Sequence, residues 1–260
     1  MEKFVRHGQL AFAVAVMGFG AQQLVYAVFG HAVAFIIPWV PDSRLWAYPT
    51  GIALLAAGLS IATNIRARVT ATVLGVFLLL VVLSLHVPRM AAHPLNISIR
   101  SCAFETLAIC GSALTLAATG PVARQAFRRF DGVLDELIKS GPLLFAFSSV
   151  VFGIDHLLVP RVIAGLVPTW IPGGLFWAYC TAAVFIVSGV CIAAAWMAGW
   201  AATVLGTMFL LWLVVLHAPR VVSAPHNPNE WSSAFIALGM CGGSWICARN
   251  ALQAPHPSTA

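Results

Sequence analysis

Apolar residues recur along this chain in runs long enough to cross a lipid bilayer, separated by short segments that are polar or rich in proline and glycine. A helix needs about 20 apolar residues to span the hydrocarbon core. The pattern therefore predicts an all-α polytopic membrane protein with eight transmembrane helices. The predicted spans are residues 9–28, 45–63, 69–87, 101–119, 142–159, 175–195, 198–218 and 231–248.

The chain also repeats itself at a separation of 131 residues. The sequence ATVLG at 71–75 recurs at 202–206, and LHVPR at 85–89 recurs as LHAPR at 216–220. Each copy contains four predicted spans, an even number, so both copies enter the bilayer from the same side and form parallel repeats. We predict a first four-helix unit over residues 1–120, a linker helix over 121–141, a second four-helix unit over 142–250 and a disordered tail over 251–260.

Composition and charge agree with this architecture. Hydrophobic residues make up 60% of the chain and charged residues 8%, whereas about a quarter of a soluble domain is charged. Basic residues favour the cytoplasmic side of a membrane protein. Nine of them lie on the side of the termini, at positions 3, 6, 66, 68, 124, 128, 129, 139 and 249, against five at 44, 89, 100, 161 and 220. We expect both termini in the cytoplasm, and the net charge of +6 gives no reason to expect a nucleic acid partner.

The linker between the units has apolar residues at helical spacing, namely Phe127, Phe130, Leu134 and Leu137, with charged residues between them. This pattern predicts an amphipathic helix that lies on the cytoplasmic leaflet, with membrane lipids as partners. A plain linker helix without lipid contact is the alternative.

Two segments on the opposite side, 30–41 and 160–172, are apolar yet interrupted by proline or glycine. Such segments are typical of interfacial or re-entrant structure, with tryptophans at head-group depth. We expect them to cap the helices, with an aromatic cap formed by Trp39, Trp170, Trp46 and Trp177.

His86 and His217 close the third span of each unit, and each is followed by a proline and an arginine, Arg89 or Arg220. A cation is favoured near a helix C-terminus, and proline cannot continue the backbone hydrogen bonding of a helix. These motifs therefore predict a helix end at the membrane interface. The alternative is a polar site, with histidine as a proton carrier or ligand.

Asp155 and His156 give a sharper signal because they lie within the fifth predicted span. Ionisable residues at that depth are costly and usually face the bundle interior or a water-filled cavity. The first unit has Gln22 and Gln23 at the corresponding positions. Hydrogen-bonded packing between helices is the alternative to a functional site.

Glu105 shows the opposite asymmetry. It lies in the first turns of the fourth span, near Arg100, and the second unit has Ile236 in its place. The first unit thus has the acid without the deep histidine, and the second has the histidine without the acid. Any chemistry that needs both must use a site shared between the units.

No catalytic signature is present. The chain lacks a P-loop, a G-x-S-x-G motif, a dinucleotide fingerprint and an H-E-x-x-H motif. The six cysteines lie within predicted spans without a C-x-x-C pair, which favours helix packing over disulfide chemistry. No histidine spacing is typical of a metal or haem site.

Each unit resembles the four-helix domain of the DoxX-like membrane proteins. The resemblance rests on the sequences FGIDH at 152–156, VPTWIP at 167–172, LFWAY at 175–179 and HAPR at 217–220, and on Gly242-Gly243. It covers most of residues 142–249 and, more weakly, 9–119. Gln23 and Ile236 depart from the histidine and glutamate that such domains carry.

The resemblance implies a bacterial inner-membrane protein. Most DoxX-like proteins have no assigned catalytic activity, and some relatives are subunits of thiosulfate:quinone oxidoreductase. We expect a binding protein for a small hydrophobic ligand, a quinone or a lipid, on its outer side. One alternative is a subunit of a quinone-linked oxidoreductase with a redox partner protein, using Glu105, His156 and His217 for proton transfer. Another is a small-molecule transporter.

Overall fold

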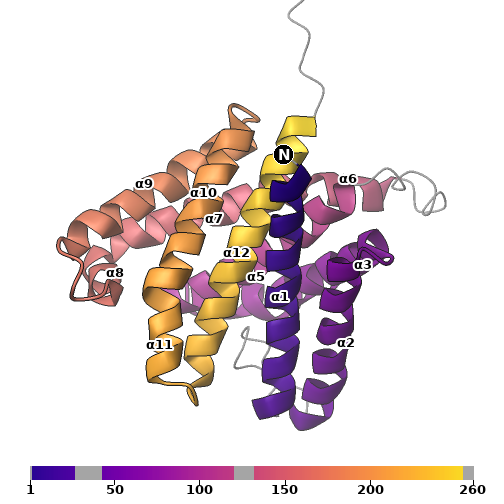
Figure 1. Cartoon of the computed structure of the whole chain (residues 1–260), viewed down its shortest axis with the longest axis horizontal. Coiled ribbons are helices and arrows are strands. Elements are labelled where there is room, and N and C mark those ends of the chain that lie inside the picture. Colours follow the sequence, from indigo (N-terminus) through magenta and orange to yellow (C-terminus); the bar gives the residue numbers. More distant parts are fainter. Residues whose placement is uncertain (1, 27–42, 120–131, 254–260) are drawn as a thin grey trace, which may run out of the picture.

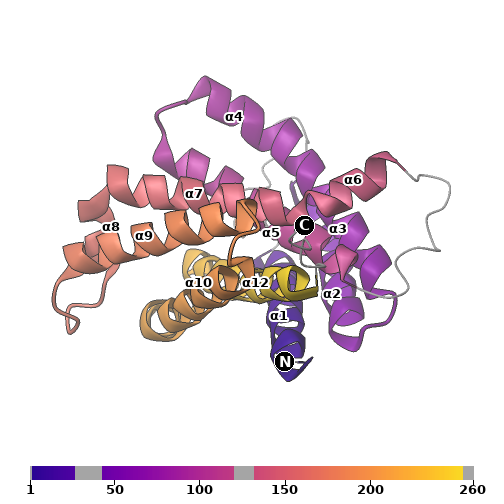
Figure 2. The same ribbon diagram turned by 90° about the horizontal axis from the view of Figure 1, so that it is seen from above.

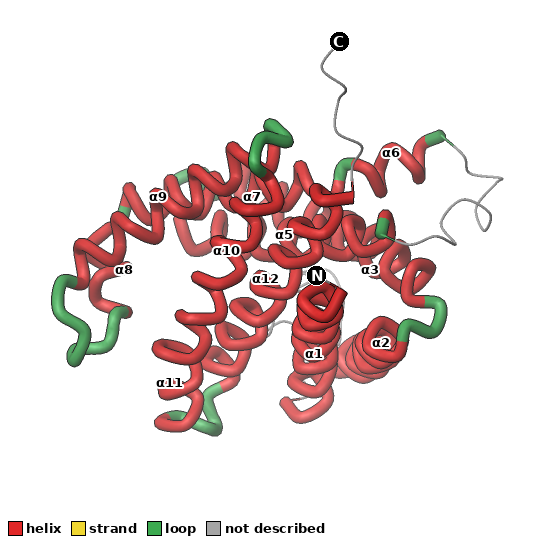
Figure 3. Tube along the Cα trace, turned by 45° about the horizontal axis from the view of Figure 1, so that its top comes forward, coloured by secondary structure: helices red, strands yellow, loops and turns green. Residues whose placement is uncertain are grey.

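The computed structural model describes residues 2–26, 43–119 and 132–253, and every regular element in these ranges is a helix (Figure 3). Eight of the described helices are long and apolar enough to span a bilayer, so the prediction of an all-α polytopic membrane protein is confirmed. The first four spans are α1 (Glu2–Tyr26), α2 (Ser43–Thr63), α3 (Ala67–Val81) continued by η1 (Val82–His86) and α4 (Val87–Ala92), and α5 (Ile97–Ala118). The second four are α7 (Gly141–Leu158), α9 (Gly174–Ala193), α10 (Ala198–Trp212) continued by η3 (Leu213–His217) and α11 (Ala218–Ser223), and α12 (Pro228–Gln253).

Left-handed backbone conformations recur in the structure at the same separation of 131 residues at which the sequence repeats. Left-handed residues in the turn before α3 are Asn64 (φ 61°) and Arg66 (φ 52°), and those before α10 are Ala195 (φ 54°) and Met197 (φ 48°). Each of these two turns is followed by a long span with a π-helical segment, η1 or η3, in the same place.

The eight spans form a closed ring in which each packs against its neighbours along the chain, and α12 closes the ring on α1. Figure 1 shows the spans α10, α12, α1 and α2 in front, with α9, α7, α5 and α3 behind them. The spans α5 and α12 also touch across the middle. They divide the ring into a first half with α1, α2 and α3 and a second half with α7, α9 and α10.

This arrangement interlocks the two units. The first helix of each unit packs on the fourth helix of the other, α1 on α12 and α7 on α5. Small residues allow the close approach: Gly8 meets Gly242 in one contact, and Gly141 meets Gly111 in the other. Each half of the ring is therefore built from both units.

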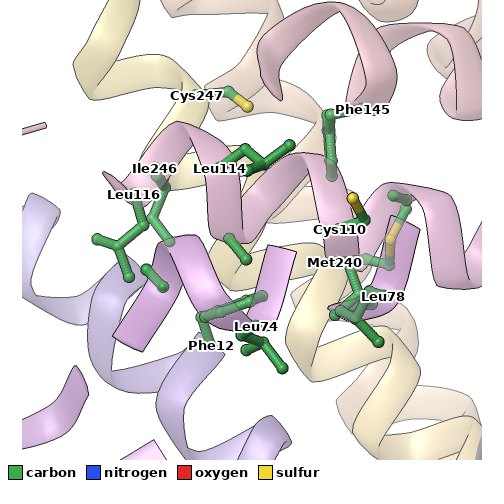
Figure 4. Close-up of a cluster of buried hydrophobic side chains, with 14 of the residues drawn as sticks. Phe12, Leu74, Leu78, Cys110, Leu114, Leu116, Phe145, Met240, Ile246 and Cys247 are labelled. Carbon is green, nitrogen blue, oxygen red and sulfur yellow. The ribbon is translucent and has the colours of Figure 1, made fainter. Parts of the chain in front are cut away.

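The core lies where the interlocked helices meet. Figure 4 shows Phe12, Leu114, Phe145 and Met240 in one cluster of buried side chains, contributed by α1, α5, α7 and α12. Outer faces of the spans also carry large exposed apolar residues, such as Val187 and Leu211. An apolar exterior is what hydrocarbon requires of a span.

The expectation that proline ends the third span of each unit is wrong. The helical path continues through Pro88 to Ala92, and through Pro219 to Ser223. The π-helical turn explains the difference, because the Val87 N–H donates to Val82, five residues back. This wider turn moves the backbone hydrogen bonds from a spacing of four residues to one of five just before Pro88, which has no N–H to donate.

The linker between the units contains α6 (Val133–Lys139). Ile138 is buried, and Leu134 and Leu137 pack against the core cluster. In this part of the linker the apolar face thus covers protein rather than lipid. Residues 120–131, which include Phe127 and Phe130, lie outside the described residues, as do 254–260 of the predicted tail.

Candidate functional site

A cavity of about 340 Å³ lies in the second half of the ring, between α5, α7, α9, α10 and α12. It is covered at one end by Ile163 and Leu166 of α8 (Pro160–Leu166), which lies alongside the end of α9 in Figure 2. The lining is mostly apolar and includes the aromatic rings of Phe152, Phe185 and Trp212. Such concave, largely apolar spaces with few polar groups are typical small-molecule sites.

The predicted aromatic cap is placed unevenly around this cavity. Trp177 lines it, donates from Nε1 to the Pro172 carbonyl at 3.2 Å and meets Trp212 edge-on. Trp170 is exposed and does not line the cavity, and Trp46 is half-exposed on α2. Trp39 lies outside the described residues.

Four of the predicted polar residues line the same cavity: Glu105 from α5, Asp155 and His156 from α7, and His217 from η3. The acid of the first unit thus meets the histidines of the second. The physical reason is the interlocking, because α5 contributes to the wall of the second half.

Asp155 is fully engaged by the protein. Its carboxylate accepts hydrogen bonds from Arg100 Nε at 2.8 Å, from Arg100 Nη2 and from Ser101 Oγ at 3.2 Å. Arg100 therefore pairs with Asp155, where the sequence suggested a place near Glu105. Because Arg100 and Ser101 belong to α5, this group ties the fourth span of the first unit to the first span of the second.

In the first half, the residues that correspond to Asp155 and His156 are the neutral Gln22 and Gln23, and both have hydrogen-bond partners. Gln22 Nε2 donates to the Pro228 carbonyl at 2.7 Å and to Ser232 Oγ at 3.1 Å. Gln23 Oε1 accepts from Thr50 at 2.7 Å. Gln22 and Gln23 therefore act as packing residues.

The two histidines at the span ends differ in their partners. His86 is buried, and its Nε2 lies 3.2 Å from Thr106 Oγ1. The residue that corresponds to Thr106 in the second unit is Ala237. His217 therefore lacks this hydroxyl at its Nε2; it lines the cavity, and its buried Nδ1 also has no hydrogen-bond partner among the described residues.

The two arginines that follow these histidines lie outside the cavity. Arg220 pairs with Glu230 through Nε at 2.8 Å and Nη2 at 3.0 Å. Arg89 lies in α4, the short helix after η1. Neither predicted arginine thus lines the site, and Arg220 instead ties the end of its span to the start of α12.

His156 is oriented by its own helix. Its Nδ1 bonds to the Phe152 carbonyl at 2.8 Å, and its ring packs on Phe185. In the described residues neither His156 Nε2 nor the carboxyl of Glu105 has a hydrogen-bond partner. Glu105, His156 and His217 are partly buried side chains that line one cavity with polar atoms left unpaired by the protein, so a polar group of a ligand can bind to them.

No group of three His, Cys, Asp or Glu side chains in the described ranges is placed to hold a metal ion. The six cysteines are free thiols. Cys110, for example, contacts the Gly75 carbonyl at 3.1 Å, which fits a packing role.

Position 237 offers a direct test of the difference between the histidines. We expect Ala237→Thr to give His217 the hydroxyl partner that His86 has, and to lower its reactivity toward diethyl pyrocarbonate about fivefold, the effect of one hydrogen bond of about 1 kcal/mol. Thr106→Ala should raise the reactivity of His86. Mass spectrometry of the labelled peptides measures both, and unchanged labelling in both variants would contradict the assignment.

Sequence reasoning missed Arg100, Ser101 and Trp212 as parts of the site. It also missed Ala237, which a comparison of the two copies at Thr106 could have found. No family model, curated protein or solved structure matches the chain. The inference of function therefore rests on the cavity and its unpaired polar groups.

Proposed function

We propose that this multi-pass membrane protein binds a small hydrophobic molecule, a quinone or a lipid, in the cavity of the second half. The observation that carries the proposal is a mostly apolar space of about 340 Å³ into which Glu105, His156 and His217 bring unpaired polar groups. Its size lies within the usual range for ligand sites, roughly 300–1,000 Å³.

The proposal includes a location. We place the protein in the inner membrane of a bacterium as a DoxX-like protein, with both termini in the cytoplasm and the cavity toward the outer leaflet. Support comes from the nine-to-five distribution of basic residues and from the sequence motifs FGIDH and HAPR. Residues of α8 line one end of the cavity, and Figure 1 shows α8 at the lower left, away from the start of α1 at the top.

A second candidate function is that of a subunit of a quinone-linked oxidoreductase. The observation in its favour is that one carboxyl and two imidazole side chains line a single cavity. Carboxyl and imidazole groups are the usual carriers of protons at an active site, and quinone chemistry consumes or releases protons.

Binding is tested with decylubiquinone as the probe. We expect it to quench tryptophan fluorescence of the purified protein, because Trp177 and Trp212 line the cavity. Glu105→Ile with His156→Gln introduces the residues of the other copy, Ile236 and Gln23. This double variant should fold, and its affinity for the reduced probe, decylubiquinol, should fall at least about tenfold, since the hydroxyls of that probe can donate to Glu105 and His156 and each lost hydrogen bond costs about 1 kcal/mol.

Thr50→Ala is the matched control, because it removes a polar contact of the first half and should leave the affinity unchanged. Mass analysis of lipid extracts from the purified protein would identify a ligand that co-purifies. If quinone and lipid analogues neither quench the fluorescence nor raise the melting temperature, the proposal is wrong.

A further inference from the structure

The hydrogen-bond donors around the cavity are largely engaged by the protein itself. The hydroxyl of Ser101 donates to Asp155 at 3.2 Å, and those of Thr181 and Ser233 donate to backbone carbonyls of their own helices at 2.9 and 3.0 Å. A hydroxyl has one proton to give. These three side chains therefore offer the cavity only lone pairs.

The ring N–H groups of Trp177 and His156 are also engaged by the protein. Trp177 Nε1 donates to a carbonyl at 3.2 Å. His156 Nδ1 lies 2.8 Å from the Phe152 carbonyl, and a carbonyl only accepts, so the proton of the neutral ring is on Nδ1. The other nitrogen, Nε2, is then an acceptor.

Glu105 adds more acceptors. The two oxygens of its carboxyl group carry lone pairs that accept, and the ionised form has no proton to donate; no described residue donates to this group. The ring N–H groups that remain belong to His217 and Trp212. The polar part of the cavity is thus rich in acceptors and poor in donors.

We infer that the ligand is held through hydroxyl groups that it donates, on a flat aromatic ring: a hydroquinone or phenol head rather than its carbonyl counterpart. The inference rests on the proposed function and narrows its ligand class. Phe152, Phe185 and Phe209 supply ring faces for such a head. One N–H of His217 can donate to the lone pair of a bound hydroxyl, while Glu105 or His156 accepts the one proton of that hydroxyl.

The test compares three probes with the same ring and tail under anaerobic conditions: decylubiquinol, decylubiquinone and the dimethyl ether of the quinol, which is larger by two methyl groups. We expect the quinol to bind at least about tenfold more tightly than the quinone, the effect of hydrogen bonds to charged or strongly accepting groups. The ether has lost its donors and should bind no better than the quinone.

Variants assign the preference to residues. Glu105→Gln and His156→Gln each introduce an amide that can donate, so each should reduce the preference for the quinol to below about threefold. Thr50→Ala should keep the full preference, because Thr50 contacts Gln23 in the other half.

Equal binding of quinol and quinone to the wild-type protein, or tighter binding of the quinone, would overturn the inference and leave the proposed function standing. A full preference in both glutamine variants would overturn it too. Failure of all three probes to bind would count against the proposed function itself.

Discussion

Arg100→Leu should lower the free energy of unfolding by about 3–5 kcal/mol, the usual cost of removing one partner from a buried ion pair. The side chain of Asp155 is only 5% exposed, so the variant would leave its carboxylate without a counter-charge inside the protein. Equilibrium unfolding in mixed detergent micelles measures the loss.

The first half of the ring suggests how to repair this variant. Gln22 takes the place of Asp155 there, and Trp231 takes the place of Arg100. We expect the double variant Arg100→Trp, Asp155→Gln to recover most of the stability, because neither residue leaves a charge unpaired.

Arg220→Leu is the control for the ion pair. Arg220 is 41% and Glu230 15% exposed, against 25% and 5% for Arg100 and Asp155, so the loss should be smaller and closer to the roughly 0–1 kcal/mol of surface pairs. A loss in Arg100→Leu no larger than in Arg220→Leu would show that the pair between α5 and α7 does not hold the two units together.

Substitution of the glycines at the contacts between the units should lower the stability about as much as loss of the ion pair does. A Cβ on Gly242 would lie 2.5 Å from Phe12 N and 2.6 Å from Gly8 O, and one on Gly111 would lie 2.7 Å from Gly141 O. Backbone atoms of a packed helix cannot move aside as a flexible side chain can. We expect Gly242→Ala and Gly111→Ala each to cost about 3 kcal/mol, at the upper end of the usual range for overpacking.

Gly165→Ala is the matched substitution, because Gly165 lies in α8 and nothing stands within 4 Å of an added Cβ. Alanine there should be neutral or stabilising by up to about 1 kcal/mol, through its higher helix propensity. Melting temperatures in detergent compare the three variants. If all three are equally stable, the helices do not meet as closely as described.

The eight spans could be predicted from the sequence because a bilayer requires long apolar helices, and the described part of the chain contains eight. Their ends were less predictable. Pro88 and Pro219 were expected to stop their helices, but a π-helical turn before each proline lets the helix continue. No local pattern identifies such a turn, since it depends on how the backbone bonds are shifted.

The site was predictable only in outline. Comparing the copies singled out Glu105 and His156 and indicated that a site using both acid and histidine must be shared, whereas His217 belongs to a motif that both copies carry and that was expected mainly to end a helix. The sequence could not indicate which spans would enclose it, because the pairing of α5 with α7 depends on glycine contacts between helices far apart in the chain. Arg100 as the partner of Asp155 follows from the same pairing.

The interlocked ring also has a consequence for biosynthesis. Helices are made in chain order, so α1 enters the membrane first, yet the helix it packs against, α12, is made last. Until then the glycine face around Gly8 has no partner from its own chain. A second nascent chain could supply its own α12 instead, which is domain swapping. High expression, at which nascent chains meet often, should therefore favour dimers that have exchanged α12. Slow insertion at low expression should favour the monomer, in which α12 packs on α1 of the same chain.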